Sequence, residues 1–96
     1  MGTIDFETIS KAKGAKSAFN KAVKEARKSH GTGGYSGTIA EKSSFVMITV
    51  PEGEDPYKYA NKLLDKEDSR IENKWGPAGC VKVSDGEFLF FGFASC

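Results

Sequence analysis

The sequence has little of what metal sites and disulfide frameworks need. It holds one histidine, His30, and two cysteines, Cys80 and Cys96. Two cysteines do not make the disulfide framework of a small secreted domain, and one histidine with two distant cysteines does not make a zinc site. We therefore expect free thiols in a reducing compartment, no bound metal and no cofactor.

Long apolar runs and a strong excess of one charge are also missing. No apolar stretch approaches the roughly 20 residues of a membrane span, and residues 1–10 lack the apolar core of a signal peptide. The formal net charge is +1, which favours neither a nucleic acid nor a membrane as a partner. We expect a cytoplasmic protein.

What the chain does contain is an ordinary globular composition with an uneven charge distribution. Its 96 residues are 39% hydrophobic and 28% charged, which predicts one compact domain over residues 1–96. Between Lys11 and Lys42 there are eight lysines and arginines but only two acids, Glu25 and Glu41. This basic segment is either a solvated helix face or a face that contacts phosphate groups.

The hydrophobic pattern predicts two helices and four strands. Residues 5–29 have apolar residues at helical spacing, mainly after Gly14, which weakens the pattern and marks a possible division. Residues 37–41 and 45–50 suggest a hairpin. Asp55 and Pro56 are typical of a helix start. The last two strands are expected at residues 80–83 and 88–94.

This order predicts an α+β fold of the form α-β-β-α-β-β. We expect a four-stranded, mostly antiparallel sheet with both helices on one face. Residues 45–50 and 88–93 are apolar on both faces, whereas a sheet face in contact with water should be polar. The second face is therefore expected to pack against another subunit, in a homodimer or larger homo-oligomer.

The most informative segment is R-K-S-H-G-T-G-G-Y-S-G-T, residues 27–38, which separates the basic helix from a strand. Glycine lets backbone N–H groups approach a ligand, yet such loops also simply end helices. The segment is not a Walker loop, because no Gly-Lys-Ser/Thr follows the glycines. It is not a dinucleotide-binding fingerprint either, because it follows a helix and precedes a strand. Its position at a helix C-terminus is unfavourable for anions, so a phosphate there would depend on nearby cations.

Several side chains near this loop suit a nucleotide-like ligand. Arg27 offers a bidentate fork for phosphate, hydroxyl groups can donate to phosphate or ribose, and Trp75 beside Lys74 resembles a platform for a base. Each also has a structural interpretation, as a solvated helix end, a turn or a core cover. The predicted ligand-binding residues are Arg27, His30, Tyr35, Ser36, Thr38, Lys74 and Trp75.

A catalytic interpretation has less support. His30 would be the general base because the pKa of a histidine lies near neutrality, and its partners would have to be Glu41 or Cys80, which no spacing rule links to it. A loop histidine is more often a helix-end residue. Cys80 reads as part of a strand rather than as a nucleophile. We predict no catalytic residues.

Three segments resemble a family of small phage and bacterial proteins. They are A-F-N-K-A-V-K-E-A-R-K-S-H-G-T-G-G-Y-S-G-T-I-A-E-K, N-K-W-G-P-A-G-C and F-F-G-F-A-S, which together cover roughly half of the chain. Other phage proteins of this size sequester cyclic nucleotides or cyclic ADP-ribose derivatives of bacterial immunity. By that analogy the resemblance implies a non-enzymatic protein that sequesters such a signal in the host cytoplasm. The alternatives are a small hydrolase with His30 as base, or an inhibitor that binds a host protein.

Overall fold

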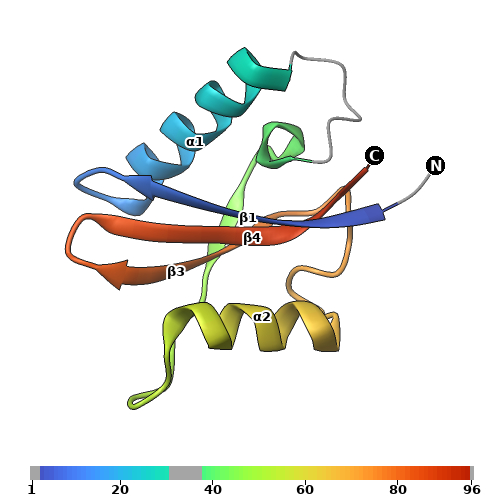
Figure 1. Cartoon of the computed structure of the whole chain (residues 1–96). Coiled ribbons are helices and arrows are strands. Elements are labelled where there is room, and N and C mark those ends of the chain that lie inside the picture. The colour runs from blue at the N-terminus through green and yellow to red at the C-terminus, as the bar shows by residue number, and fades with distance from the viewer. Residues whose placement is uncertain (1–2, 31–37, 96) are drawn as a thin grey trace.

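The computed structural model describes residues 3–30 and 38–95 as a sheet with a helix on either side (Figure 1). Its elements, in chain order, are β1 (Thr3–Lys11), α1 (Ala15–His30), the 3-10 helix η1 (Ile39–Glu41), β2 (Phe45–Met47), α2 (Pro56–Lys66), β3 (Ala78–Ser84) and β4 (Glu87–Ser95). The main order is therefore β-α-β-α-β-β, not the expected α-β-β-α-β-β. No helix in the described part of the chain is long and apolar enough to cross a membrane.

The four strands form one mixed, mostly antiparallel sheet in the order β1-β4-β3-β2. β4 pairs antiparallel with both β1 and β3, and β2 pairs parallel with β3. The Asp85–Gly86 turn joins β3 to β4, and Gly86 has a φ of 74°, which glycine adopts without steric cost. The expected α+β class and the last two strands are confirmed.

The two helices lie on opposite faces of this sheet, so the prediction that they share one face is wrong (Figure 1). On one face, Phe88 and Phe90 pack into a core with α1. On the other face, Leu89 and Phe91 pack into a second core with α2. Successive residues of a strand point to opposite faces, so one apolar strand serves both cores.

This arrangement explains the apolar second face without a partner subunit. Phe91 and Leu89 are 0% and 1% exposed in the single chain, because α2 and the segment after it cover them. The observation that favoured a homo-oligomer therefore has an explanation within one chain. The oligomer itself stays a prediction.

The first strand replaces the expected start of the first helix. Residues 3–11 pair with β4 over their whole length, from Thr3 opposite Ser95 to Lys11 opposite Glu87. β-Branched residues are frequent in this segment and favour an extended chain. The helix begins only after Gly14, whose carbonyl accepts the first hydrogen bond, from the Ala18 N–H at 3.0 Å.

The expected hairpin of residues 37–41 and 45–50 is also absent. The described part of the first segment forms η1, which begins where Thr38 Oγ1 accepts a hydrogen bond from the Ala40 N–H at 3.2 Å. Phe45 pairs with Ala78 in β3, in the parallel direction. The Thr38 cap and the pairing of β2 with β3 therefore decide the structure of these residues, although their composition favours a hairpin.

The second helix follows the prediction closely. Asp55 Oδ1 accepts a hydrogen bond from the Tyr57 N–H at 3.0 Å, and Pro56 occupies the first turn. Leu63 and Leu64 are buried against the sheet. The helix ends where Glu67 adopts a left-handed conformation, with a φ of 50°.

Candidate functional site

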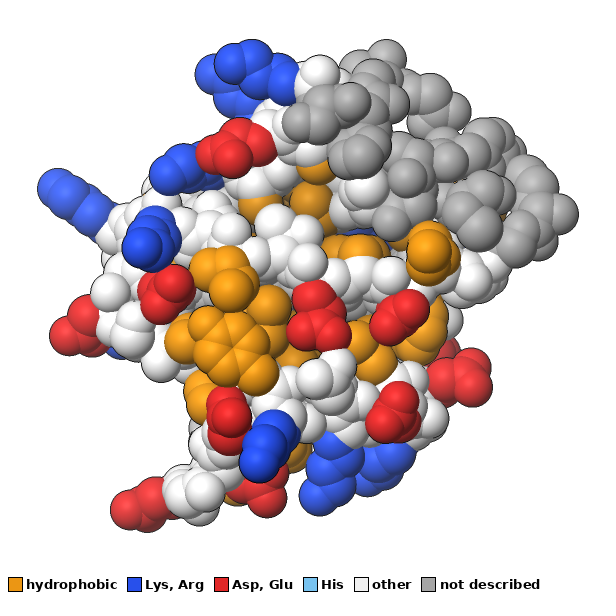
Figure 2. Space-filling view, viewed as in Figure 1, with side chains coloured by type: hydrophobic (Ala, Val, Ile, Leu, Met, Phe, Trp, Pro, Cys, Tyr) orange, Lys and Arg blue, Asp and Glu red, His pale blue; other side chains and the backbone are white. Residues whose placement is uncertain are grey.

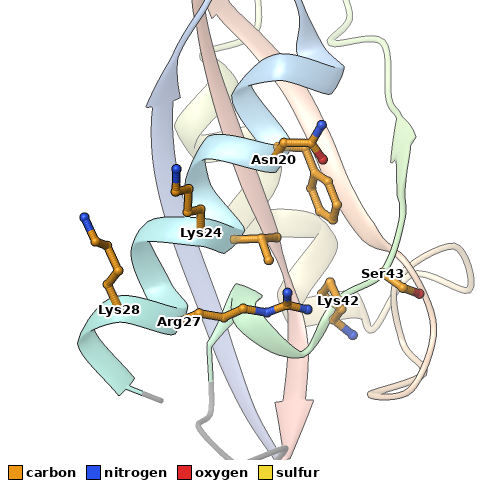
Figure 3. Close-up of a pocket in the computed structure, with 8 residues that line it drawn as sticks. Asn20, Lys24, Arg27, Lys28, Lys42 and Ser43 are labelled. Carbon is orange, nitrogen blue, oxygen red and sulfur yellow. The ribbon is translucent and has the colours of Figure 1, made fainter. Parts of the chain in front are cut away.

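A groove of about 580 Å³ lies between α1 and the chain that follows η1 (Figure 3). We call it the α1 groove. Its lining residues are Phe19, Asn20, Val23, Lys24, Arg27, Lys28, Lys42 and Ser43. A volume of this size is within the usual range for sites that hold small molecules.

The floor of the groove is apolar and held in place by the core. Phe19 and Val23 are 6% and 8% exposed. The Phe19 ring lies 5.0 Å from the Phe45 ring and 5.6 Å from the Phe90 ring, measured between centroids. Three rings from a helix and two strands thus support one surface, which restricts the motion of the floor.

The walls of the groove are basic because of helical spacing. The buried face of α1 includes Val23. Lys24 is the next residue along the chain and Arg27 lies one helical turn later, so these cations, together with Lys28, line the border of the buried face. In Figure 3 the Arg27 side chain points across the groove towards Lys42, while Lys24 and Lys28 point away from it. Arg27 is therefore the helix cation best placed to reach into the groove.

Lys42 closes the groove from the opposite side and is 2% exposed. Its Nζ donates hydrogen bonds to the carbonyl oxygen atoms of Lys74 at 3.0 Å and Asn73 at 3.4 Å. It also lies 6.0 Å from the centre of the Phe6 ring. A buried ammonium group needs such partners, and here they connect η1 to the loop before β3. The sequence offered no sign of this burial, because a lysine followed by two serines reads as a surface turn.

A second, smaller cavity of about 230 Å³ continues the α1 groove towards the start of the helix. It shares Phe19, Asn20 and Ser43 with the first cavity and adds Lys16. The cations of the combined groove are Lys16, Lys24, Arg27, Lys28 and Lys42, and its described lining contains no carboxylate. The ion pairs of the described residues, Arg70–Asp68 and Lys82–Asp85, lie outside it.

Cations of the groove lie at both ends of α1. Arg27 and Lys28 lie in the last turn of α1, where the unsatisfied carbonyl groups carry partial negative charge. Lys16 lies in the first turn, where the backbone N–H groups already favour an anion. Cations therefore border the groove from the first turn of α1 to the last.

Of the predicted residues that the structure describes, Arg27 is the one that lines the groove. Thr38 caps η1 and so has a structural role. Tyr35, Ser36 and the side chain of His30 lie outside the described residues. The sequence reasoning missed the contributions of Lys42 and Ser43, which it placed in a hairpin turn.

Lys74 and Trp75 lie beside the groove but do not line it. The Lys74 Nζ is 5.5 Å from the centre of the Trp75 ring, and Trp75 is 60% exposed. Asn73 orders this loop, since its Oδ1 accepts a hydrogen bond from the Trp75 N–H at 2.8 Å. The carbonyl group of Lys74, rather than its amine, connects the loop to the site through Lys42.

The described residues offer little for catalysis. Cys80 is 0% exposed in the core beneath α1, and burial raises the pKa of its thiol to about 12, so it is not a nucleophile at neutral pH. The described residues include no group of three or more histidine, cysteine, aspartate or glutamate side chains that would hold a metal ion.

Comparison with known proteins identified no relative of this chain. No family model matches the chain, and no match was found among curated proteins or among solved structures.

Proposed function

We propose that this protein binds a small, phosphate-bearing molecule in the α1 groove and releases it unchanged. The observation that carries this proposal is the Arg27 side chain, which points across an apolar floor in a groove with further cations at its border and no carboxylate in its described lining. Phosphate is recognised by arginine forks and lysine charges, while an apolar floor accommodates a sugar or base. A nucleotide-like ligand combines both chemistries.

Sequestration is favoured over hydrolysis by the side chains of the groove. Its described lining has no carboxylate, imidazole or thiol. These are the groups that most often act as general acid, general base or nucleophile. The resemblance to phage proteins agrees with this proposal, because a protein that competes with a bacterial receptor needs only to hold the signal. A nucleotide-derived immune signal is therefore the ligand class that we propose.

The direct experiment separates binding from turnover. Purified protein is incubated with a panel of cyclic di- and trinucleotides and cyclic ADP-ribose isomers, filtered, and then heat-denatured. We expect one compound to disappear from the filtrate and to return intact after heating. A compound that returns altered would indicate an enzyme, and a panel that stays in the filtrate would overturn the proposal.

Variants of the groove locate the binding site. Arg27→Ala should lower the affinity for the retained compound about tenfold or more, because it removes charge-assisted hydrogen bonds. Arg27→Lys tests the fork itself, since a lysine keeps the charge but cannot bind phosphate in a bidentate manner. Lys62→Ala is the matched control, because Lys62 is an exposed cation on α2, on the other face of the sheet. Equal affinities for Arg27→Ala and Lys62→Ala would place the ligand elsewhere.

A further inference from the structure

The sheet has one long open edge, which is β1. Among the described residues β1 pairs only with β4, and it does so over nine residues without a bulge. The opposite edge strand, β2, has three residues. Proteins commonly protect sheet edges by keeping them short, by bending them or by placing charged side chains on them, and β1 has only the charged side chains.

The backbone groups that face this open edge can be identified. The Ala12 N–H donates to the Gly86 carbonyl oxygen at 3.0 Å, which continues the pairing of β1 with β4. Hydrogen bonding alternates along an antiparallel strand. The backbone N–H and C=O groups of the even-numbered residues of β1 therefore point to β4, and those of the odd-numbered residues point to the open edge. The contact of Lys21 Nζ with the Lys11 carbonyl oxygen, at 3.2 Å, agrees with this assignment.

The exposed side chains on one face of β1 are an isoleucine flanked by charged residues. Asp5, Glu7, Ile9 and Lys11 lie on the same face of β1, the face that carries α2, and all four are exposed. Ile9 is 48% exposed, although it is opposite buried Leu89. Figure 2 shows apolar and acidic side chains gathered between the two helical layers on the face that is viewed.

We propose that β1 pairs antiparallel with β1 of a second copy of this chain, around a two-fold axis at Ile9. This pairing places Ile9 against Ile9 and each Glu7 against Lys11 of the other copy. The exposed isoleucine becomes an apolar contact and two ion pairs form, each between side chains directly opposite one another. Two four-stranded sheets then join into one sheet of eight strands.

Charge selects this register over its neighbours. An axis at Glu7 would bring two carboxylates together, which is destabilising in a cross-strand pair. An axis at Thr8 would place Glu7 against Ile9, with no partner for the carboxylate. The axis at Ile9 alone pairs every charged side chain from Glu7 to Lys11 with an opposite charge. Lys21 does not prevent it, because the Lys11 carbonyl oxygen has a second acceptor site.

Sedimentation velocity of the full chain tests the assembly. We expect a concentration-dependent species of twice the 10.4 kDa chain mass. Glu7→Lys and Lys11→Glu should each weaken dimerisation on the order of tenfold, because each brings like charges together. An equimolar mixture of the two variants should restore the dimer, since both cross-strand pairs are then of opposite charge. Circular dichroism confirms that each variant is folded.

Cysteine cross-linking tests the register. In a Cys96→Ser background, Ile9→Cys should form a disulfide-linked dimer on oxidation, because opposed Cα atoms about 5.5 Å apart permit a disulfide. Glu7→Cys is the matched control and should not, because the two Glu7 positions lie four residues out of register. A chain that stays monomeric, a dimer that both charge variants leave unchanged, or cross-linking at Glu7 would each overturn the proposal. A monomer would leave this edge available to a strand from another protein.

Discussion

The Nζ of Lys42 lies 3.0 Å from the backbone carbonyl oxygen of Lys74, 32 residues further along the chain. The same amine reaches the Asn73 carbonyl oxygen, so one buried side chain holds the loop before β3 against η1. It also forms one wall of the α1 groove. Stability and the candidate site thus depend on the same residue.

Replacement of Lys42 by methionine should destabilise the protein by about 2 kcal/mol, because it leaves two carbonyl oxygen atoms without this donor in a largely buried setting. Chemical denaturation at neutral pH measures the change. Lys62→Met, an exposed lysine on α2, is the control and should change stability by less than about 0.5 kcal/mol. If both variants unfold at the same denaturant concentration, the buried contact contributes nothing.

A side chain at Gly79 should be strongly unfavourable. A Cβ atom there would lie 2.8 Å from Phe91 Cζ and 3.0 Å from Ile71 Cγ2, and both residues are at most 1% exposed. Gly79→Ala should therefore lower the free energy of unfolding by about 1–3 kcal/mol. Gly14→Ser is the control, because a Cβ atom at Gly14 meets nothing within 4 Å. A stability of Gly79→Ala equal to that of the control would show that the core repacks at no cost.

Protonation of Asp68 should lower the stability of the protein at acid pH. The Arg70 side chain donates to Asp68 Oδ1 at 2.8 Å and to Oδ2 at 3.1 Å, and together with the Arg70 N–H it lowers the pKa of the carboxyl group from 3.8 to about 2. The pKa is lower in the folded state, so the stabilisation is complete above about pH 4 and is lost as the pH falls towards 2.

The Asp68→Asn variant measures this contribution, which we expect to be about 1 kcal/mol at pH 7 for a partly exposed pair. The difference from the parent protein should shrink between pH 4 and pH 2. Asp65→Asn, in the exposed part of α2, should show neither effect. A difference that stays constant down to pH 2 would contradict the assigned pKa.

Cys80 should resist modification in the folded protein, because its thiol is buried and has a pKa of about 12. In the Cys96→Ser variant, a thiol reagent at neutral pH should react at least on the order of a thousandfold more slowly than in denaturant, since reaction requires local or global opening. Mild denaturant should speed the reaction. Rapid modification of the native protein would show that the core beneath α1 opens easily.

Local sequence signals were sufficient where the chain forms its own caps and turns. Asp55 and Pro56 marked the start of α2, and the apolar runs at residues 80–83 and 88–94 marked β3 and β4. The same kind of signal was misleading at the N-terminal end, where the helical pattern was extended back over β1. The pairing of that strand with β4, the last element of the chain, lies beyond any local window.

In the candidate site too, some residues could be recognised from local sequence and others only from the tertiary structure. Arg27 was recognisable as a candidate for phosphate binding because its chemistry and its position near a glycine-rich loop are visible in the sequence. Lys42 was not, because its burial depends on carbonyl groups of a loop more than thirty residues away. Lys74 and Trp75 were predicted as a platform for a base, and the structure places their loop behind Lys42, outside the lining of the groove.

The sequence by itself determined the class of fold, the second helix, the last two strands and the basic character of α1, since these follow from periodicity, caps and composition. Only the tertiary structure decided that the helices lie on opposite faces, that the first residues form an edge strand and that Lys42 is buried. The physical reason is that a strand's partner and the face that a helix covers depend on contacts between distant segments. The apolar residues on both faces of β4 are compatible with a partner subunit or with a second helix, and folding selected the helix.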